Sequence, residues 1–220
     1  MLKAKHNMVI YPFFQYYNNF ILKKHFKEIR FIGEMEDHDK PILLISNHIS
    51  WWDGFWHEYF NRKYFNRKYH FMMLEEQLRK HWFLNYCGGF SVQKKSRSII
   101  ESINYTVELL NDNRNMVLIF PQGEINSLYN NTVVFEKGIE SILMKVKDLV
   151  QICFVVNLID YFSDVKPTCY FNFKEYNEQA FDVVSIQKSY NDFFCQCVEK
   201  QKKCLFIAKK MVSILLNSNI

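Results

Sequence analysis

The chain has 220 residues, of which 49% are hydrophobic and 23% are charged, which is the balance of an ordinary globular protein. A single well-buried domain accounts for a chain of this length. The net charge of +5 is mild, and the basic residues are too scattered for nucleic acid to be an expected partner. Aromatic residues make up 17% of the chain, which indicates an apolar groove or a membrane-facing surface, or else a bias in composition.

Four kinds of site or segment are not expected. The six cysteines show no framework spacing, so reduced thiols in a cytosolic protein are the simplest interpretation. No stretch approaches the roughly 20 apolar residues of a spanning helix, and the N-terminus has no apolar core followed by a cleavage site. The histidine and cysteine spacings do not match a metal site, so we expect no metal.

The middle of the chain alternates between strand-like and helix-like segments. Apolar runs of strand length lie at 41–46, 69–74, 90–92, 116–120 and 150–156, and segments of helical period lie at 52–65, 75–86, 96–110 and 136–147. This alternation predicts an α/β fold with a central mixed, largely parallel sheet that helices cover on both faces.

The two ends are predicted to be helical. Between about residues 9 and 29, large apolar side chains recur on roughly one helical face, and Lys23, Lys24 and Lys27 follow near its end. This segment is either an amphipathic helix in the headgroup layer of a membrane or a helix that covers the sheet. We therefore expect one domain over 1–220, with this helix in about 1–30, a core in about 30–160 and a C-terminal helix in about 184–218.

A candidate catalytic pair follows the first predicted buried strand. His48 lies directly after this strand, and Asp53 lies five residues later, at the start of a predicted helix. Ligands of open α/β sheets gather at the carboxyl ends of strands. There Asp53 would orient one imidazole nitrogen while the other takes a proton from an attacking hydroxyl. The alternative is that Asp53 only caps the helix and His48 is an ordinary loop residue.

The order of further motifs resembles the lysophospholipid acyltransferase family, the glycerolipid acyltransferases of the 1-acylglycerol-3-phosphate acyltransferase type. The Asn-His-x-x-x-x-Asp pattern at 47–53 resembles the family's first motif. Cys-Gly-Gly-Phe-Ser-Val-Gln-Lys at 87–94 resembles the second, and Phe-Pro-Gln-Gly-Glu at 120–124 the third. The Lys-Gly stretch at 135–139 and the apolar block at 150–156 follow in the family's order, although the block lacks the usual proline. The resemblance covers about residues 30 to 160.

The resemblance implies transfer of a fatty acyl group from an acyl-CoA or acyl-carrier-protein thioester to the hydroxyl of a lysophospholipid or other lyso-lipid. His48 would be the general base and Asp53 its partner, with the thioester as co-substrate and no cofactor. Backbone amides near Gly123 are candidates for stabilising the oxyanion. The expected location is cytoplasmic, peripheral on the inner face of the membrane.

The third motif departs from the family pattern. Gln122 replaces a glutamate, and Glu124 and Ile125 replace a threonine and an arginine that would suit an acceptor phosphate. Three accounts remain: other cations replace the arginine, the acceptor carries no phosphate, or activity is lost. Glu124 could instead be a surface loop residue, and the basic cluster at 94–97 a solvated patch. The residues expected to bind substrate are Gln122, Gly123, Glu124, Lys94, Lys95 and Arg97.

Two further functions stay open at this point. One is a catalytically silent lipid- or acyl-binding protein with the same fold, which the altered third motif favours and the intact His48 and Asp53 oppose. The other is an acyl-thioester hydrolase, in which water replaces the acceptor hydroxyl and the same base serves.

Overall fold

The computed structural model describes residues 1–93, 98–130, 132–147 and 149–217, with side chains up to residue 203. Within these residues seven strands form one sheet in the order β1-β7-β6-β2-β5-β3-β4. The strands are β1 (Glu28–Ile32), β2 (Ile42–Ser46), β3 (Lys68–Leu74), β4 (Gly89–Val92), β5 (Asn115–Ile119), β6 (Gln151–Asp160) and β7 (Thr168–Glu175). Every neighbouring pair is parallel except β6 with β7, which confirms the predicted mixed, largely parallel sheet.

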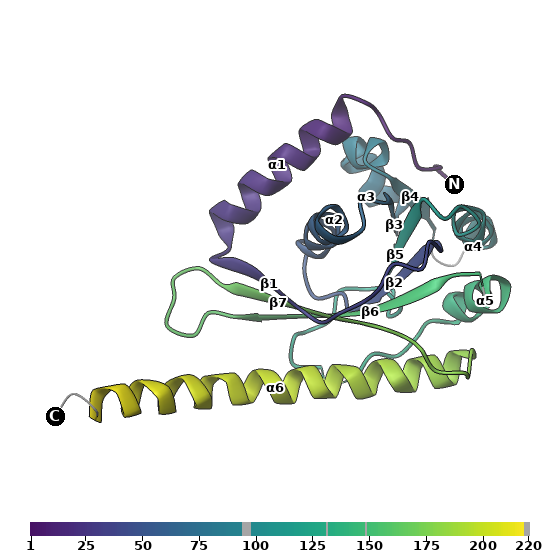
Figure 1. The fold of residues 1–220 in the computed structure, drawn as a ribbon. Helices are drawn as coiled ribbons and strands as arrows, with labels where there is room; N and C mark the ends of the chain where they lie inside the picture. The colour runs from purple at the N-terminus through teal and green to yellow at the C-terminus, as the bar shows by residue number, and fades with distance from the viewer. Residues whose placement is uncertain (94–97, 131, 148, 218–220) are drawn as a thin grey trace.

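Helices cover both faces of this sheet (Figure 1). On one face lie α1 (Ile10–His25), α2 (Asp53–Tyr64), α3 (Glu75–Lys80) and the 3-10 helix η1 (Trp82–Tyr86). On the other face lie α4 (Ser98–Leu109), α5 (Lys137–Val146) and α6 (Val183–Asn217). The predicted N-terminal and C-terminal helices are therefore both present.

The central strand β2 explains how the sheet organises two cores. All five of its residues are buried, as expected for a strand covered on both faces. Leu43 and Ile45 pack with α4, α5 and α6, whereas Ile42 and Leu44 pack with α1 and α2. Alternate side chains of one strand point to opposite faces, so a single apolar run supplies both cores.

The structure differs from the sequence-based expectation at three places. The helix expected over 75–86 is two elements, because the backbone leaves the helical region at His81. The N-terminal helix ends at His25, since the chain enters strand β1 at Glu28. Strands β1 and β7 were not anticipated, although the TCYFNFKE sequence of β7 is rich in aromatic residues that suit strands.

Candidate active site

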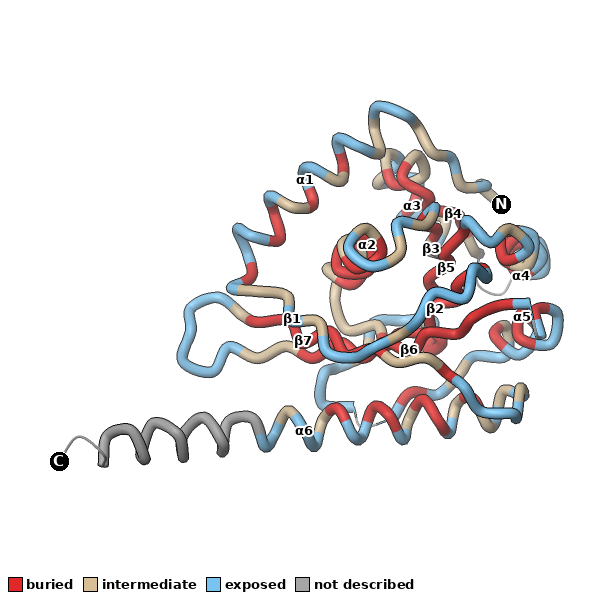
Figure 2. Tube along the Cα trace, in the orientation of Figure 1, coloured by how far each residue is buried: buried red, intermediate tan, exposed pale blue. Residues whose placement is uncertain are grey.

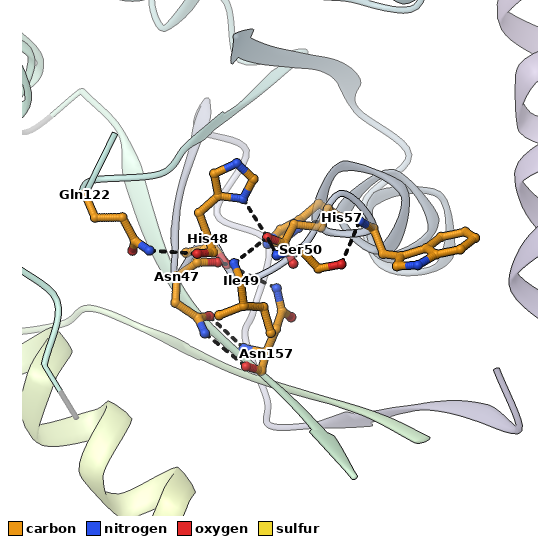
Figure 3. Close-up of polar contacts among 10 residues, drawn as sticks. Asn47, His48, Ile49, Ser50, His57, Gln122 and Asn157 are labelled. Carbon is orange, nitrogen blue, oxygen red and sulfur yellow. Dashed lines mark hydrogen bonds and ion pairs between the residues drawn. The ribbon is translucent and has the colours of Figure 1, made fainter. Parts of the chain in front are cut away.

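The carboxyl end of β2 and the start of α2 bring His48 and Asp53 together. Figure 3 shows His48 with Ile49 and Ser50 of the same loop. The Nδ1 atom of His48 lies 2.6 Å from Oδ2 of Asp53, which is fully buried. The same oxygen accepts the backbone N–H groups of Ile49 at 2.8 Å and of Ser50 at 3.0 Å. One carboxylate oxygen thus fixes both the ring and the loop that carries it.

This geometry sets the tautomer of His48. Oδ2 of Asp53 already accepts two backbone N–H groups, so it is also the acceptor of the contact with the ring, and Nδ1 carries the proton. The other ring nitrogen, Nε2, is then left with its lone pair. Since 23% of the His48 side chain is exposed, the ring can meet a substrate. The pair is arranged as a general base with its orienting carboxylate.

Burial dominates the electrostatics of Asp53. Loss of hydration raises the pKa of its carboxyl above the ordinary value of 3.8. The hydrogen bond and charge of His48, and the amides of Ser50 and Ile49, act in the opposite direction. Its second oxygen, Oδ1, is buried with no hydrogen-bond partner among the described residues. A proton taken up by His48 during a reaction would therefore be stabilised by a poorly hydrated carboxylate.

The neighbouring strand β5 holds the His48 loop from one side. The ring of Phe120 stacks on the His48 ring, with centroids 4.0 Å apart and planes 9° apart. The Nε2 amide of Gln122 donates a hydrogen bond to the backbone carbonyl of His48 at 2.8 Å. The same carbonyl accepts the backbone N–H of Asn126 at 2.9 Å. The loop after β5 thus positions His48 through three contacts.

Strand β6, the other neighbour of β2, holds the loop from the opposite side. The side chain of Asn47 donates to the carbonyl of Asn157 at 3.0 Å and accepts its N–H at 2.8 Å. Sequence reasoning missed this role. The available signal was that Asn157 interrupts the apolar run of β6, where a buried polar side chain requires a partner.

Comparison with protein families shows which family this chain belongs to. The family model described as acyltransferase matches residues 20–156, more than half of the chain and including the whole His48 loop. The chain belongs to the acyltransferase family. A comparison with curated proteins finds none that this sequence matches.

The other residues expected in the acyltransferase site differ in their burial and contacts. Gln122 is buried against the His48 loop rather than facing solvent. Gly123 occupies the left-handed region with φ of 67°, and its N–H donates to Phe120 within a turn at 3.0 Å. That amide is engaged, which removes it as a free oxyanion donor. Glu124 is exposed, and Lys94, Lys95 and Arg97 lie outside the described residues.

The Lys-Gly stretch of the acyltransferase pattern begins α5 and is tied to the third motif. The backbone N–H of Glu136 donates to the carbonyl of Pro121 at 2.8 Å, so the start of α5 fixes the entry to the Gln122 loop. Motifs that are separated in the sequence thus form a spatial cluster around the carboxyl ends of β2 and β5.

A small pocket lies beside the His48 loop. It is lined by Asn47, Ile49, Gln122, Asn126, Ser127, Leu128, Asn130, Thr132, Val133, Leu158 and Phe194. Val133, Leu158 and Phe194 belong to the core on the α6 side, whereas the His48 ring turns toward α2. The pocket therefore lies behind the His48 loop and does not open onto the ring.

Two features are absent from the described residues. Within the ranges described, no group of three or more His, Cys, Asp or Glu side chains is arranged to hold a metal ion. In the same part of the chain, none of the helices combines the length and apolar character needed to cross a bilayer.

Proposed function

We propose that this protein transfers a fatty acyl group from an acyl-CoA or acyl-carrier-protein thioester to the hydroxyl of a lyso-lipid. The observation that carries the proposal is the 2.6 Å contact between Nδ1 of His48 and Asp53, which leaves Nε2 as the base. Membership of the acyltransferase family supports the reaction class.

In this reaction His48 first accepts a proton and then returns it. Nε2 of His48 takes the proton of the acceptor hydroxyl as its oxygen attacks the thioester carbonyl. The tetrahedral intermediate collapses when the carbon–sulfur bond breaks, and the leaving thiolate receives the proton from the imidazolium. Asp53 stabilises the imidazolium between these two transfers. No acyl-enzyme is required.

The loop after β5 supports an acceptor headgroup without phosphate. Residues 121–135 contain no Lys or Arg, and Ile125 is 56% exposed where the family pattern has an arginine. Exposed Glu124 in the same loop would repel a phosphate. Neutral polar side chains such as Asn126 and Ser127 suit a hydroxyl- or amide-bearing headgroup instead. An uncharged polar lyso-lipid is therefore the favoured acceptor.

The test is thioester consumption with a panel of lysophospholipids and phosphate-free lyso-lipids, using both CoA and carrier-protein donors. Wild type should release thiol only when an acceptor is present, and His48→Ala should be slower by about 10²- to 10⁴-fold. His38→Ala, which changes an exposed histidine far from the pair, is the matched control and should retain wild-type activity.

Two outcomes would contradict the proposal. Thiol release that is equally fast without any acceptor would identify a thioester hydrolase. Failure of folded wild type to consume either donor with every acceptor would favour a silent acyl-binding protein. Activity confined to the phosphate-bearing acceptors would leave the reaction standing and overturn the acceptor assignment.

A further inference from the structure

A second histidine, His57, lies close to the pair of His48 and Asp53 and takes no part in the proposed reaction. It belongs to α2, about one helical turn after Asp53, and its side chain is fully buried. Figure 3 shows it with the loop of His48. Figure 2 shows that buried positions recur along α2, which lies between α1 and the sheet. His57 therefore faces the interior near the start of α2.

A hydrogen bond connects His57 to the residue that carries the carboxylate. Its Nδ1 atom lies 2.6 Å from the backbone carbonyl oxygen of Asp53. A carbonyl oxygen only accepts hydrogen bonds, so Nδ1 of His57 carries the proton and donates it. The same oxygen has a second lone pair for the backbone N–H that the helix supplies four residues later. The His57 ring thus fixes the orientation of the peptide that follows Asp53.

A ring contact connects His57 to the base as well, through Phe120. The His57 ring meets that of Phe120 edge-on, with centroids 5.9 Å apart and planes 85° apart. Phe120 in turn stacks on His48, with centroids 4.0 Å apart. Phe171 of β7 lies 5.0 Å from the His57 ring and restricts its movement. His57 therefore contacts both the residue that bears the carboxylate and the residue that stacks on the base.

The charge state of His57 suits a supporting role. Burial lowers its pKa to about 3, the hydrogen bond to Asp53 acts in the opposite direction, and a positive charge on His48 lowers the pKa further. The ring is therefore neutral at neutral pH and poorly suited to accept a proton itself. A neutral ring can donate its hydrogen bond without repelling the imidazolium that forms at His48.

Packing alone does not explain a histidine at this position. Its Nε2 atom is buried and has no hydrogen-bond partner among the described residues. An unpartnered buried acceptor lowers stability, and a phenylalanine ring of similar size would not carry that cost. Local choices that lower stability are expected at functional sites. What histidine provides and phenylalanine cannot is the Nδ1–H donor to Asp53.

We propose that His57 is a positioning residue for acyl transfer, whose Nδ1–H group holds Asp53 and whose ring holds Phe120 against His48. The base lies in the loop after β2 and the carboxylate on α2, so their contact depends on how these two elements are held together. A displacement of about 1 Å in such a pair can lower the rate by about 10²-fold. This inference rests on the proposed function, because it concerns the same reaction.

The test compares two replacements that separate the donor of His57 from its ring. His57→Phe keeps a ring and removes the donor, whereas His57→Asn places an amide nitrogen near the position of Nδ1 and removes the ring. In acyl-transfer assays, His57→Phe should lower kcat by about 10- to 100-fold with little change in KM. His57→Asn should be the more active of the two but the less stable in thermal unfolding, because loss of the ring leaves a cavity. A purely structural role would rank activity and stability in the same order.

Proton NMR of the full chain measures the pair without any substrate. The Nδ1 proton of His48, in its 2.6 Å contact with Asp53, should give a resonance downfield of the backbone amides, which His48→Ala removes. His57→Phe should shift or broaden this resonance. The matched control is His70→Phe, since His70 is also buried but its ring lies 3.3 Å from Asn115, at the amino end of β5. The control should change neither the resonance nor kcat.

Three results would overturn the role of His57. They are a folded His57→Phe with the kcat of wild type, an unchanged His48 resonance in that variant, and a His57→Asn that is less active than His57→Phe. If His57→Phe does not fold, His57→Met, which also lacks a donor, replaces it in both measurements. A folded wild type that is inactive with every donor and acceptor would overturn the proposed function instead, and the His48 resonance would still decide whether His57 holds the pair.

Discussion

Strands β2 and β5 are neighbours in the sheet, so the loops that follow them lie side by side. The two loops nevertheless contribute to the site in different ways. The loop after β2 supplies the ionisable pair, His48 and Asp53. The loop after β5 contributes a ring, an amide and a backbone N–H, through Phe120, Gln122 and Asn126, and all three contact His48. Chemistry and positioning are therefore divided between two parallel strands.

This division explains why the second loop can depart from the family pattern while the first keeps it. In the proposed mechanism, a general base and its carboxylate have no neutral substitute. Position 122, in contrast, must donate a hydrogen bond to a carbonyl, which an amide does and an ionised carboxylate does not. In this chain, glutamine is the residue that the geometry requires.

The largest effect is expected when the carboxylate of the first loop is neutralised. Asp53→Asn keeps an oxygen for the donors of His48, Ile49 and Ser50, but it removes the charge that stabilises the imidazolium. Acyl transfer should fall by about 10²- to 10⁴-fold. The measurement is the rate of thiol release at saturating thioester. Asp192→Asn, which changes an exposed carboxylate on α6, should leave the rate unchanged.

The same variant should alter how stability depends on pH. Burial raises the pKa of Asp53 in the native state above 3.8, so the native protein binds this proton more tightly than the unfolded chain does. The resulting stabilisation is complete below pH 3.8 and is lost as the pH rises through the native pKa. Asp53→Asn lacks this titration. The difference between the free energies of unfolding of the variant and of wild type should therefore shift in favour of the variant as the pH rises through the native pKa. Urea unfolding at a series of pH values checks this, and parallel curves would contradict it.

A smaller effect is expected from Gln122→Glu in the second loop. The carboxylate would face the His48 carbonyl at a buried position, so two acceptors would repel each other. A displaced base should lower kcat by about 10- to 100-fold with little change in KM. Activity should recover partly at acidic pH, where the protonated carboxyl can donate. Gln122→Met neither donates a hydrogen bond nor repels the carbonyl. Its kcat should lie between those of wild type and Gln122→Glu, and it should show no recovery at acidic pH.

The contrast between the two loops also shows what the sequence could predict. The Asn-His-x-x-x-x-Asp spacing predicted that His48 and Asp53 form a pair, and the structure places them in contact, because a short motif between a strand and a helix fixes its own geometry. The position of Gln122 depends on β5 pairing with β2, a contact between residues more than 70 positions apart. The sequence marked Gln122 as part of the site but could not show that its amide points at the His48 backbone.

The same limit applies to the fold. The buried runs of β2, β5 and β6 were recognisable from their apolar residues. Strand β1 was not recognised, because its five residues mix charged and apolar side chains and its partner β7 lies far along the chain. For α1 the sequence left two interpretations, and the structure shows that one side of the helix is packed while the other remains exposed.

Gly123→Ala tests how far the positioning role of the second loop depends on its turn. Gly123 has φ of 67°, a conformation that costs an alanine about 1 kcal/mol. Stability should fall by this amount, and activity should fall several-fold as the strain shifts the adjacent Gln122. Gly123→Asn is the matched control, because asparagine tolerates this region. Equal melting temperatures for wild type and the alanine variant would show that the turn adjusts without cost.

The smallest effect is expected at Glu124, an exposed residue of the second loop. Its side chain is exposed, and no hydrogen bond or ion pair connects it to a described residue. With the uncharged acceptor proposed above, Glu124→Gln should change kcat and KM by less than about twofold, since exposed charges contribute little. A large rise in KM for the acceptor alone would show that Glu124 binds the headgroup. The second loop would then hold the acceptor through a charged contact, which would argue against an uncharged headgroup.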